Sequence, residues 1–87
     1  MYKPQTKDYV SKAGNEFKFQ TVLPSKWAQI MDQITDKHGK IVFSKSMPKM
    51  LETVIVQPQG LKMDDFETWV ELEEVTEAAF LFQRFGE

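Results

Sequence analysis

The 87-residue sequence contains no cysteine and a single histidine. Without cysteine the chain has no disulfide scaffold, iron–sulfur cluster, zinc ribbon or thiol nucleophile, and a reducing, intracellular setting is favoured. His38 has no second histidine or cysteine at a spacing that would form a metal site, and we interpret it as a cation at the C-terminal end of a helix. We therefore expect no metal and no cofactor.

Long apolar runs and catalytic patterns are also missing. No stretch approaches the ~20 apolar residues of a membrane-spanning helix, and the first eight residues lack the apolar segment of a signal peptide. The serines have no neighbouring histidine and acid, and the paired acids at 64–65 and 73–74 are adjacent in sequence, so they point ~100° apart on a helix. We expect a soluble cytoplasmic protein that is not an enzyme and has no membrane partner.

Arginine is nearly absent, since Arg84 is the only one, and the ten lysines stand singly along the chain. Nucleic-acid-binding proteins usually cluster Lys and Arg on one face, so we expect no nucleic-acid partner. The charges are unevenly divided: residues 1–60 carry nine lysines and five acids, a balance of +4, whereas residues 61–87 carry two cations and eight acids, a balance of −6. This polarity suits head-to-tail contact between copies of the chain. The alternative interpretation of the same charges is a domain with scattered lysines and a solvated acidic helix on its surface.

The length is that of one small domain. Residues 1–7 are polar and contain a proline, which is typical of a flexible arm, so the domain is predicted to occupy residues 8–87. A chain of this size has a modest core, and a large apolar surplus would be shared with a partner.

A β-hairpin is predicted near the N-terminus. Phe17 and Phe19 alternate with polar residues in the segment Glu16–Val22, and Asp8–Lys12 precedes it across a glycine-containing turn at 13–15. A hairpin alone is only marginally stable in water, so its aromatic face is expected to pack on helices.

Two amphipathic helices are predicted to follow the hairpin. The first runs from Lys26 to His38, with Ser25 as its N-cap and Gly39 as a left-handed C-cap, because its apolar residues recur at helical spacing. The second is capped by Ser46 and ends in the β-branched run at 54–56. Between the two helices, residues 41–43 are predicted to form a short strand or an extended core segment.

The last element is predicted to be a long helix from Asp65 to Arg84. Asp64 is its expected N-cap, and Glu67 has the spacing that completes a capping box. No residue within this segment breaks a helix, so its length is about 30 Å.

The aromatic residues of this last helix are predicted to form a partner-binding surface. Apolar side chains surround most of the circumference at its C-terminal end, and a small domain cannot cover all of them. Aromatic anchors contribute strongly to protein interfaces. The candidate partner-binding residues are Trp69, Phe80, Phe82 and Phe85.

Together these elements predict an α+β fold, mainly α, in which the N-terminal β-hairpin packs on about three helices, the last one long. No internal repeat or linker interrupts this arrangement. The hairpin residues Phe17 and Phe19 are expected to pack on apolar residues of all three helices, namely Trp27, Ile30, Leu51 and Trp69.

The layout also resembles a known family, the small tail assembly chaperones of long-tailed phages and prophages of Gram-positive bacteria. Besides the hairpin, three segments carry the resemblance: Asp-Lys-x-Gly at 36–39, the run Leu51–Pro58, and Asp64-Asp65-Phe66 before an acidic helix. The resemblance extends from about Val10 to Phe85. Members often have an acid where Gln57 stands and Pro-Gly where Pro24-Ser25 stands, so the chain departs from the family pattern at these positions.

The resemblance implies a non-enzymatic protein in the cytoplasm of the bacterial host cell. Such a protein coats the tape-measure protein before tail-tube subunits polymerise around it, and it is absent from the mature virion. The implied partner is the tape-measure protein, with the tail-tube protein as a second candidate, and the charge polarity favours a homo-oligomer. Two alternatives are a small acidic regulator or inhibitor that imitates nucleic acid, and a minor structural component of the tail.

Overall fold

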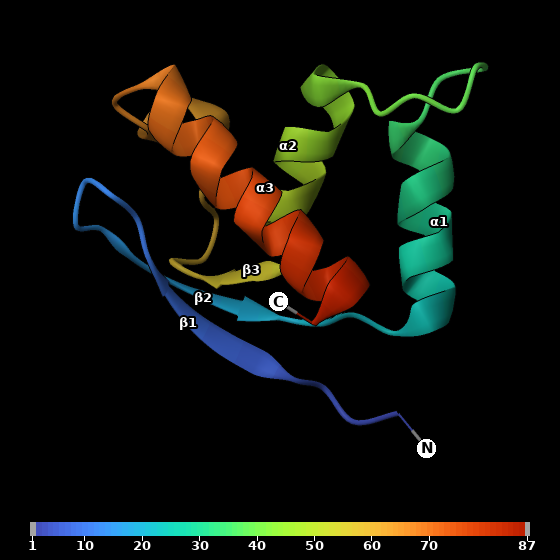
Figure 1. The fold of residues 1–87 in the computed structure, drawn as a ribbon, viewed down its shortest axis with the longest axis horizontal. Helices are drawn as coiled ribbons and strands as arrows, with labels where there is room; N and C mark the ends of the chain where they lie inside the picture. Colours follow the sequence, from blue (N-terminus) through green and yellow to red (C-terminus); the bar gives the residue numbers. More distant parts are fainter. Residues whose placement is uncertain (1, 87) are drawn as a thin grey trace.

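The computed structural model describes residues 2–86, which form a three-stranded antiparallel sheet and three α-helices (Figure 1). The strands, in spatial order, are β1 (Thr6–Val10), β2 (Glu16–Gln20) and β3 (Ile55–Gln57). The helices are α1 (Pro24–Ile34), α2 (Phe43–Thr53) and α3 (Trp69–Phe85), and a 3-10 turn, η1, spans Met63–Asp65. The prediction of an α+β fold with an N-terminal hairpin and a long last helix is confirmed.

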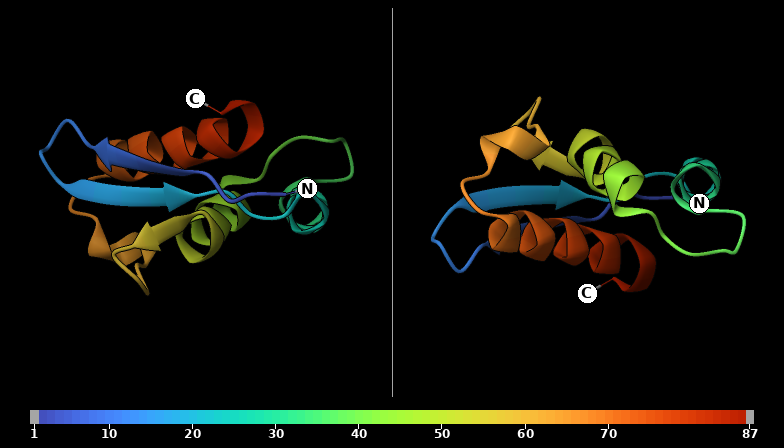
Figure 2. Two further views of the ribbon diagram at one scale, coloured as in Figure 1. Left: turned by 90° about the horizontal axis from the view of Figure 1, so that it is seen from below. Right: turned by 90° about the horizontal axis from the view of Figure 1, so that it is seen from above.

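The elements form two layers. α2 and α3 lie side by side on one face of the sheet, and α1 packs beside α2 beyond the ends of the strands. No helix of the described chain covers the other face of the sheet, which the left view of Figure 2 shows from below. The alternation along β2 follows from this arrangement: Phe17 and Phe19 are buried toward the helices, whereas Glu16 is exposed.

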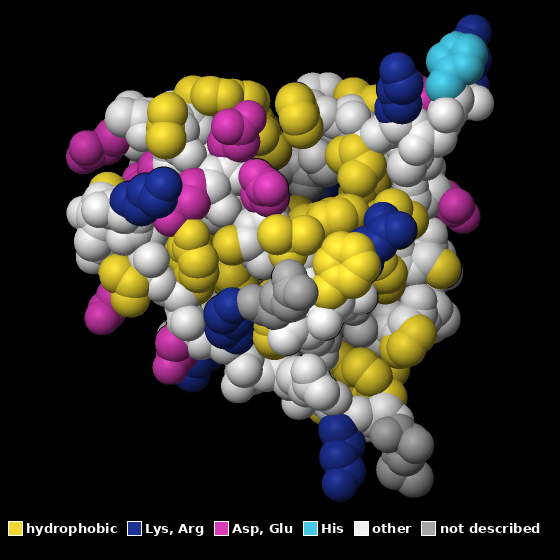
Figure 3. Space-filling view, in the orientation of Figure 1, with side chains coloured by type: hydrophobic (Ala, Val, Ile, Leu, Met, Phe, Trp, Pro, Cys, Tyr) yellow, Lys and Arg dark blue, Asp and Glu magenta, His cyan; other side chains and the backbone are white. Residues whose placement is uncertain are grey.

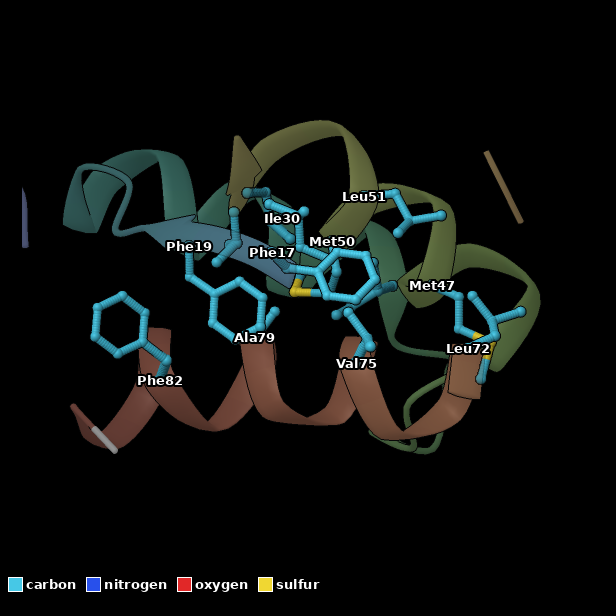
Figure 4. Close-up of a cluster of buried hydrophobic side chains, with 13 residues drawn as sticks. Phe17, Phe19, Ile30, Met47, Met50, Leu51, Leu72, Val75, Ala79 and Phe82 are labelled. Carbon is cyan, nitrogen blue, oxygen red and sulfur yellow. The ribbon is translucent and has the colours of Figure 1, made fainter. Parts of the chain in front are cut away.

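Phe19 lies at the centre of the core. Its side chain is completely buried, its ring stacks on that of Tyr9 with 5.3 Å between centroids, and the ring of Phe82 lies 6.2 Å away. Across the sheet it pairs with Ile55 of β3. Figure 4 shows α3 facing β2 and α2 through Leu72, Val75, Ala79 and Phe82. Ile30 and Ile34 of α1 are buried in the same cluster, so the sheet and all three helices share one core.

The predicted neighbours of the hairpin are mostly found in this core. Ile30 and Leu51 belong to the same buried cluster as Phe17 and Phe19, and Trp27 packs against that cluster from α1. Trp69 does not, because its side chain is 52% exposed at the beginning of α3.

The first helix lies further toward the N-terminus than predicted. It begins at Pro24, which is tolerated in a first turn because the missing N–H has no helical partner there, so Ser25 is not the N-cap. It ends at Ile34, because Thr35 is extended and pairs with Ile41. The predicted extension through residue 38 is therefore wrong.

A tight turn replaces the predicted end of that helix. The Asp36 carboxylate accepts the backbone N–H groups of His38 at 2.8 Å and Lys40 at 3.0 Å. Gly39 has a φ of 78°, which glycine adopts without strain, but it serves this turn and not a helix C-cap. His38 is therefore a turn residue and does not interact with a helix dipole.

The β-branched run at 54–56 extends the sheet instead of ending a helix. α2 begins at Phe43 and ends at Thr53, with Ser46 buried inside it and not at its N-cap. β3 then pairs with β2, and the N–H of Gln20 donates to the carbonyl of Val54 at 2.8 Å. Branched side chains favour strands, but the sequence does not reveal that β2 offers a free edge to pair with.

The last helix begins four residues later than predicted. Asp64 and Asp65 lie in η1, where the Asp65 carboxylate accepts the N–H of Lys62 at 2.9 Å. The N-cap of α3 is Thr68, whose hydroxyl accepts the N–H of Glu71 at 3.2 Å. The acids before the helix therefore close a separate turn and do not cap α3.

Part of the predicted arm belongs to the sheet. Thr6 and Lys7 are the first residues of β1. Before them, the Tyr2 hydroxyl donates to the carbonyl of Thr21 at 2.7 Å, and the N–H of Gln5 donates to the Thr21 hydroxyl at 2.9 Å.

Two glutamates of α3 bind the hairpin. The Glu71 side chain is 7% exposed, and its carboxylate accepts hydrogen bonds from the Ser11 hydroxyl at 2.6 Å and the Asn15 amide at 2.7 Å. These bonds lower the pKa of Glu71. One turn further along, Glu74 accepts a hydrogen bond from the Tyr9 hydroxyl, and burial together with this carboxylate raises the pKa of Tyr9 to about 12.

We expect the protein to lose stability in acid through Glu71. A carboxyl group whose pKa is lower in the folded state stabilises that state fully above its ordinary pKa of 4.5, and this contribution is lost as the pH falls through the lower folded value. Glu71→Gln should therefore reduce the free energy of unfolding at neutral pH by ~1–3 kcal/mol, since it leaves the hairpin groups imperfectly paired.

Denaturant unfolding at several pH values measures this effect. Below about pH 5, wild type should lose stability more steeply than Glu71→Gln. The exposed Glu77→Gln on the same helix is the control and should follow wild type. Parallel pH profiles for wild type and Glu71→Gln would contradict the stabilising role of this carboxylate.

Candidate partner-binding surface

The four predicted partner-binding residues lie at different depths along α3. Trp69 and Phe85, at its two ends, are 52% and 60% exposed. Phe80 is half-buried, and Phe82 is 4% exposed within the core. The structure therefore leaves three of the four accessible to a partner.

Phe82 must be removed from the predicted surface. At ~100° per residue it falls on the same side of α3 as Val75 and Ala79, which faces the sheet. Its ring lies against Phe19. Phe82→Ser would consequently test the core and not partner binding.

Phe43 joins the surface at the beginning of α3. Its ring is 58% exposed and meets that of Trp69 edge-on, with 6.4 Å between centroids. The sequence suggests instead that residues 41–43 are an extended segment of the core. No local signal indicates the exposure of Phe43, because it depends on the N-terminal ends of α2 and α3 lying together.

A groove of about 290 Å³ lies between α2 and α3. Its apolar lining consists of Ile41, Phe43, Met47, Met50 and Phe80, and its polar lining of Ser46, Glu73, Thr76 and Glu77. Figure 3 shows hydrophobic side chains gathered beside α3 on this face, with acidic side chains over the first half of the helix. The groove therefore has an apolar floor and an acidic wall.

Phe80 connects this groove to the end of α3. Its ring packs on that of Trp27, with 5.5 Å between centroids. The guanidinium carbon of Arg84 lies 5.9 Å from the centre of the Phe80 ring and 5.5 Å from that of Phe85, so one cation contacts both rings. The contact between Trp27 and Phe80 and the contacts of Arg84 thus extend the aromatic surface from the groove to the C-terminal end of α3.

These contacts form a connected surface along α3, which we call the α3 strip. It comprises Phe43, Trp69, Phe80 and Phe85 together with the groove between α2 and α3. At ~100° per residue, Trp69 and Phe80 lie on the groove side of α3, about 17 Å apart along the helix, whereas Phe85 lies ~140° around the helix from Phe80 and joins the strip through Arg84. Its length and its aromatic content suit a protein segment better than a small molecule.

A larger hollow of about 720 Å³ lies on another side of α2, where Leu51, Leu61 and Met63 contribute to its lining. No aromatic side chain lines it, and its charged residues include both Lys62 and Asp64. It lacks the aromatic anchors that distinguish the α3 strip, so we regard the strip as the candidate site.

Residues 2–86 contain no group of three or more histidine, aspartate and glutamate side chains placed to hold a metal ion. Within the same residues, no helix is both long and apolar enough to cross a bilayer. Comparisons with protein-family models, curated proteins and solved structures find no match to this chain.

Proposed function

We propose that this protein is a tail assembly chaperone of a long-tailed phage or prophage. It is a non-enzymatic protein of the bacterial host's cytoplasm that binds the tape-measure protein, self-associates along it and is absent from the mature virion. The sequence resemblance suggests this class, and the exposed α3 strip is the observation that best supports it.

The α3 strip has the properties of a protein-binding surface. Soluble monomers rarely expose large contiguous apolar patches without a partner, and here Phe43, Trp69 and Phe85 are each more than half exposed. A long helical tape-measure protein offers many similar sites in sequence. Each contact need only be weak, because one bound copy raises the effective concentration of the next.

The strip favours this function over an acidic inhibitor that imitates nucleic acid. Such a mimic needs a dense array of free carboxylates, whereas Glu71 and Glu74 are bound to the hairpin. Exposed aromatic side chains also have no role in imitating a phosphate backbone. The acids of α3 are thus divided between holding the fold and flanking an apolar groove.

Self-association is expected to run head to tail. The turn with Lys37, His38 and Lys40 projects at one corner of the molecule, and acidic side chains stand at the opposite upper corner in Figure 3. Asp64 and Asp65 of η1 are exposed. Contact between two unlike patches builds open chains of subunits wherever the rotation between copies does not close a ring, and such chains suit the coating of a long partner.

Light scattering at several salt concentrations tests this arrangement. Salt should loosen the oligomer without abolishing it, because charge attraction is screened while apolar burial is not. Lys37→Glu combined with Lys40→Glu should weaken association, whereas Lys18→Glu on the open face of the sheet is the control. A monomer at every salt and protein concentration would rule out self-association.

Co-expression with the tape-measure protein of the same phage or prophage tests the function as a whole. Wild type should keep the tape-measure protein soluble and co-purify with it, since it covers apolar segments that otherwise aggregate. If the tape-measure protein is equally soluble without this chain and does not co-purify with it, the proposed function is wrong. A salt-sensitive complex with a basic host protein instead would favour the acidic inhibitor.

A further inference from the structure

We propose that the groove between α2 and α3 receives a large apolar side chain of a basic amphipathic helix, and that Glu73 and Glu77 pair with a Lys or Arg one turn away on that helix. This inference rests on the proposed function, because it names the chemistry that the partner presents to the α3 strip.

The lining of the groove suits an apolar side chain. Met47 and Met50, at 2% and 1% exposed, belong to the core on which the groove lies, and Phe43 and Phe80 contribute aromatic walls. The volume of about 290 Å³ is at the lower limit of the ~300–1,000 Å³ typical of small-molecule sites. Methionine adapts to differently shaped neighbours, so several apolar side chain types fit.

The charge of the groove selects a basic partner. Glu73 and Glu77 are the charged residues in its lining, they are one helical turn apart, and both are exposed. Neither forms a salt bridge within residues 2–86, in contrast to Glu71 and Glu74, whose carboxylates bind hairpin groups. Two unpaired carboxylates beside an apolar floor attract a cation that flanks an apolar side chain.

The walls of the groove favour a partner segment that is helical over one that is extended. Within α3 the backbone groups along the groove are hydrogen-bonded inside the helix, so they offer no edge to a strand. An extended segment lying there would leave its own N–H and C=O groups unpaired against apolar side chains, at a cost in free energy. A helix satisfies these groups internally and can follow the groove side of the strip for about 17 Å, from Trp69 to Phe80.

Labelled peptides provide the probe for this site. The first is a helical 20-residue peptide with leucines along one face and a lysine four residues from each leucine; in the second every such lysine is glutamate, and in the third the leucines are alanine. Fluorescence anisotropy should show the leucine–lysine peptide binding wild type at least about tenfold more tightly than either of the others. Its affinity should fall as salt is raised.

Variants of the acidic wall test whether Glu73 and Glu77 cause the preference for the leucine–lysine peptide. Glu73→Gln combined with Glu77→Gln should weaken binding of the leucine–lysine peptide by about tenfold and flatten its salt dependence. The matched control is Glu16→Gln, on the sheet face away from the groove, which should bind as wild type does. Phe43→Ser tests the apolar wall and, because Phe43 is 58% exposed, leaves the core in place.

The proposal is overturned if wild type binds the lysine and glutamate peptides equally, or if the double Gln variant keeps wild-type affinity and salt dependence. Co-expression separates this outcome from failure of the proposed function. If the tape-measure protein co-purifies equally with wild type and the double Gln variant, the groove assignment fails while the function stands. If the peptides behave as expected but no tape-measure protein co-purifies, the groove stands and the function fails.

Discussion

Replacing Phe19 by alanine should lower the free energy of unfolding by ~3–5 kcal/mol. The side chain is completely buried, stacks on Tyr9, contacts Phe82 of α3 and pairs across the sheet with Ile55. Its removal leaves a cavity where the hairpin, the third strand and the long helix meet. Because small domains are stable by only ~5–15 kcal/mol, this variant should lose a large part of its stability.

Denaturant unfolding followed by circular dichroism measures this loss. Val10→Thr is the control on the same hairpin, because Val10 is 59% exposed and threonine keeps the branched shape. It should change stability by no more than ~0.5 kcal/mol. If Phe19→Ala unfolds at the same denaturant concentration as wild type, Phe19 does not lie in the core as described.

Replacing Trp69 by serine should cause the largest loss of partner binding. Trp69 is 52% exposed and meets the exposed ring of Phe43, so it can be removed without opening the core. Loss of an aromatic anchor commonly costs more than ~2 kcal/mol, which corresponds to roughly 30-fold in Kd. Phe85→Ser, at the other end of the α3 strip, should weaken binding in the same direction.

Titration of a soluble tape-measure segment measures these effects, with thermal unfolding as the check on the fold. Val10→Ser is the matched control, because it also replaces an exposed apolar side chain by serine but lies on β1, away from the strip. It should bind as wild type does. If Trp69→Ser and Val10→Ser bind equally well, Trp69 is not an anchor.

The hairpin and the core residues could be predicted because their signals are local and periodic. Phe17 and Phe19 alternate with polar residues, and the sheet buries one side of that alternation. The apolar positions of α2 recur at helical spacing, and Met50 and Leu51 are buried accordingly. Such patterns report which face of an element points inward, whatever it packs against.

The ends of the elements depend on contacts that the local sequence does not contain. The run at 54–56 becomes strand β3 only because β2 lies beside it. The first helix stops at Ile34 because Thr35 pairs with Ile41 across the turn made by Asp36. In both places the tertiary structure overrides a helical pattern in the sequence.

The candidate surface was predictable in kind but not in detail. An excess of aromatic residues on the last helix indicates that some must be exposed, and Trp69 and Phe85 are. Phe82 is buried because the register of α3 against the sheet is set by Thr68 as its N-cap and by the core. Phe43 belongs to the surface because α2 begins beside α3, which no local pattern shows.

The most direct test of the proposed binding surface is a nuclear magnetic resonance map of the protein with and without a soluble tape-measure segment. Signals of Phe43, Trp69, Phe80 and Phe85 should shift on binding, while those of Val10 and other residues on the open sheet face stay in place. Shifts concentrated on the open face of the sheet, with the α3 strip unchanged, would contradict the assignment of this strip as the partner-binding surface.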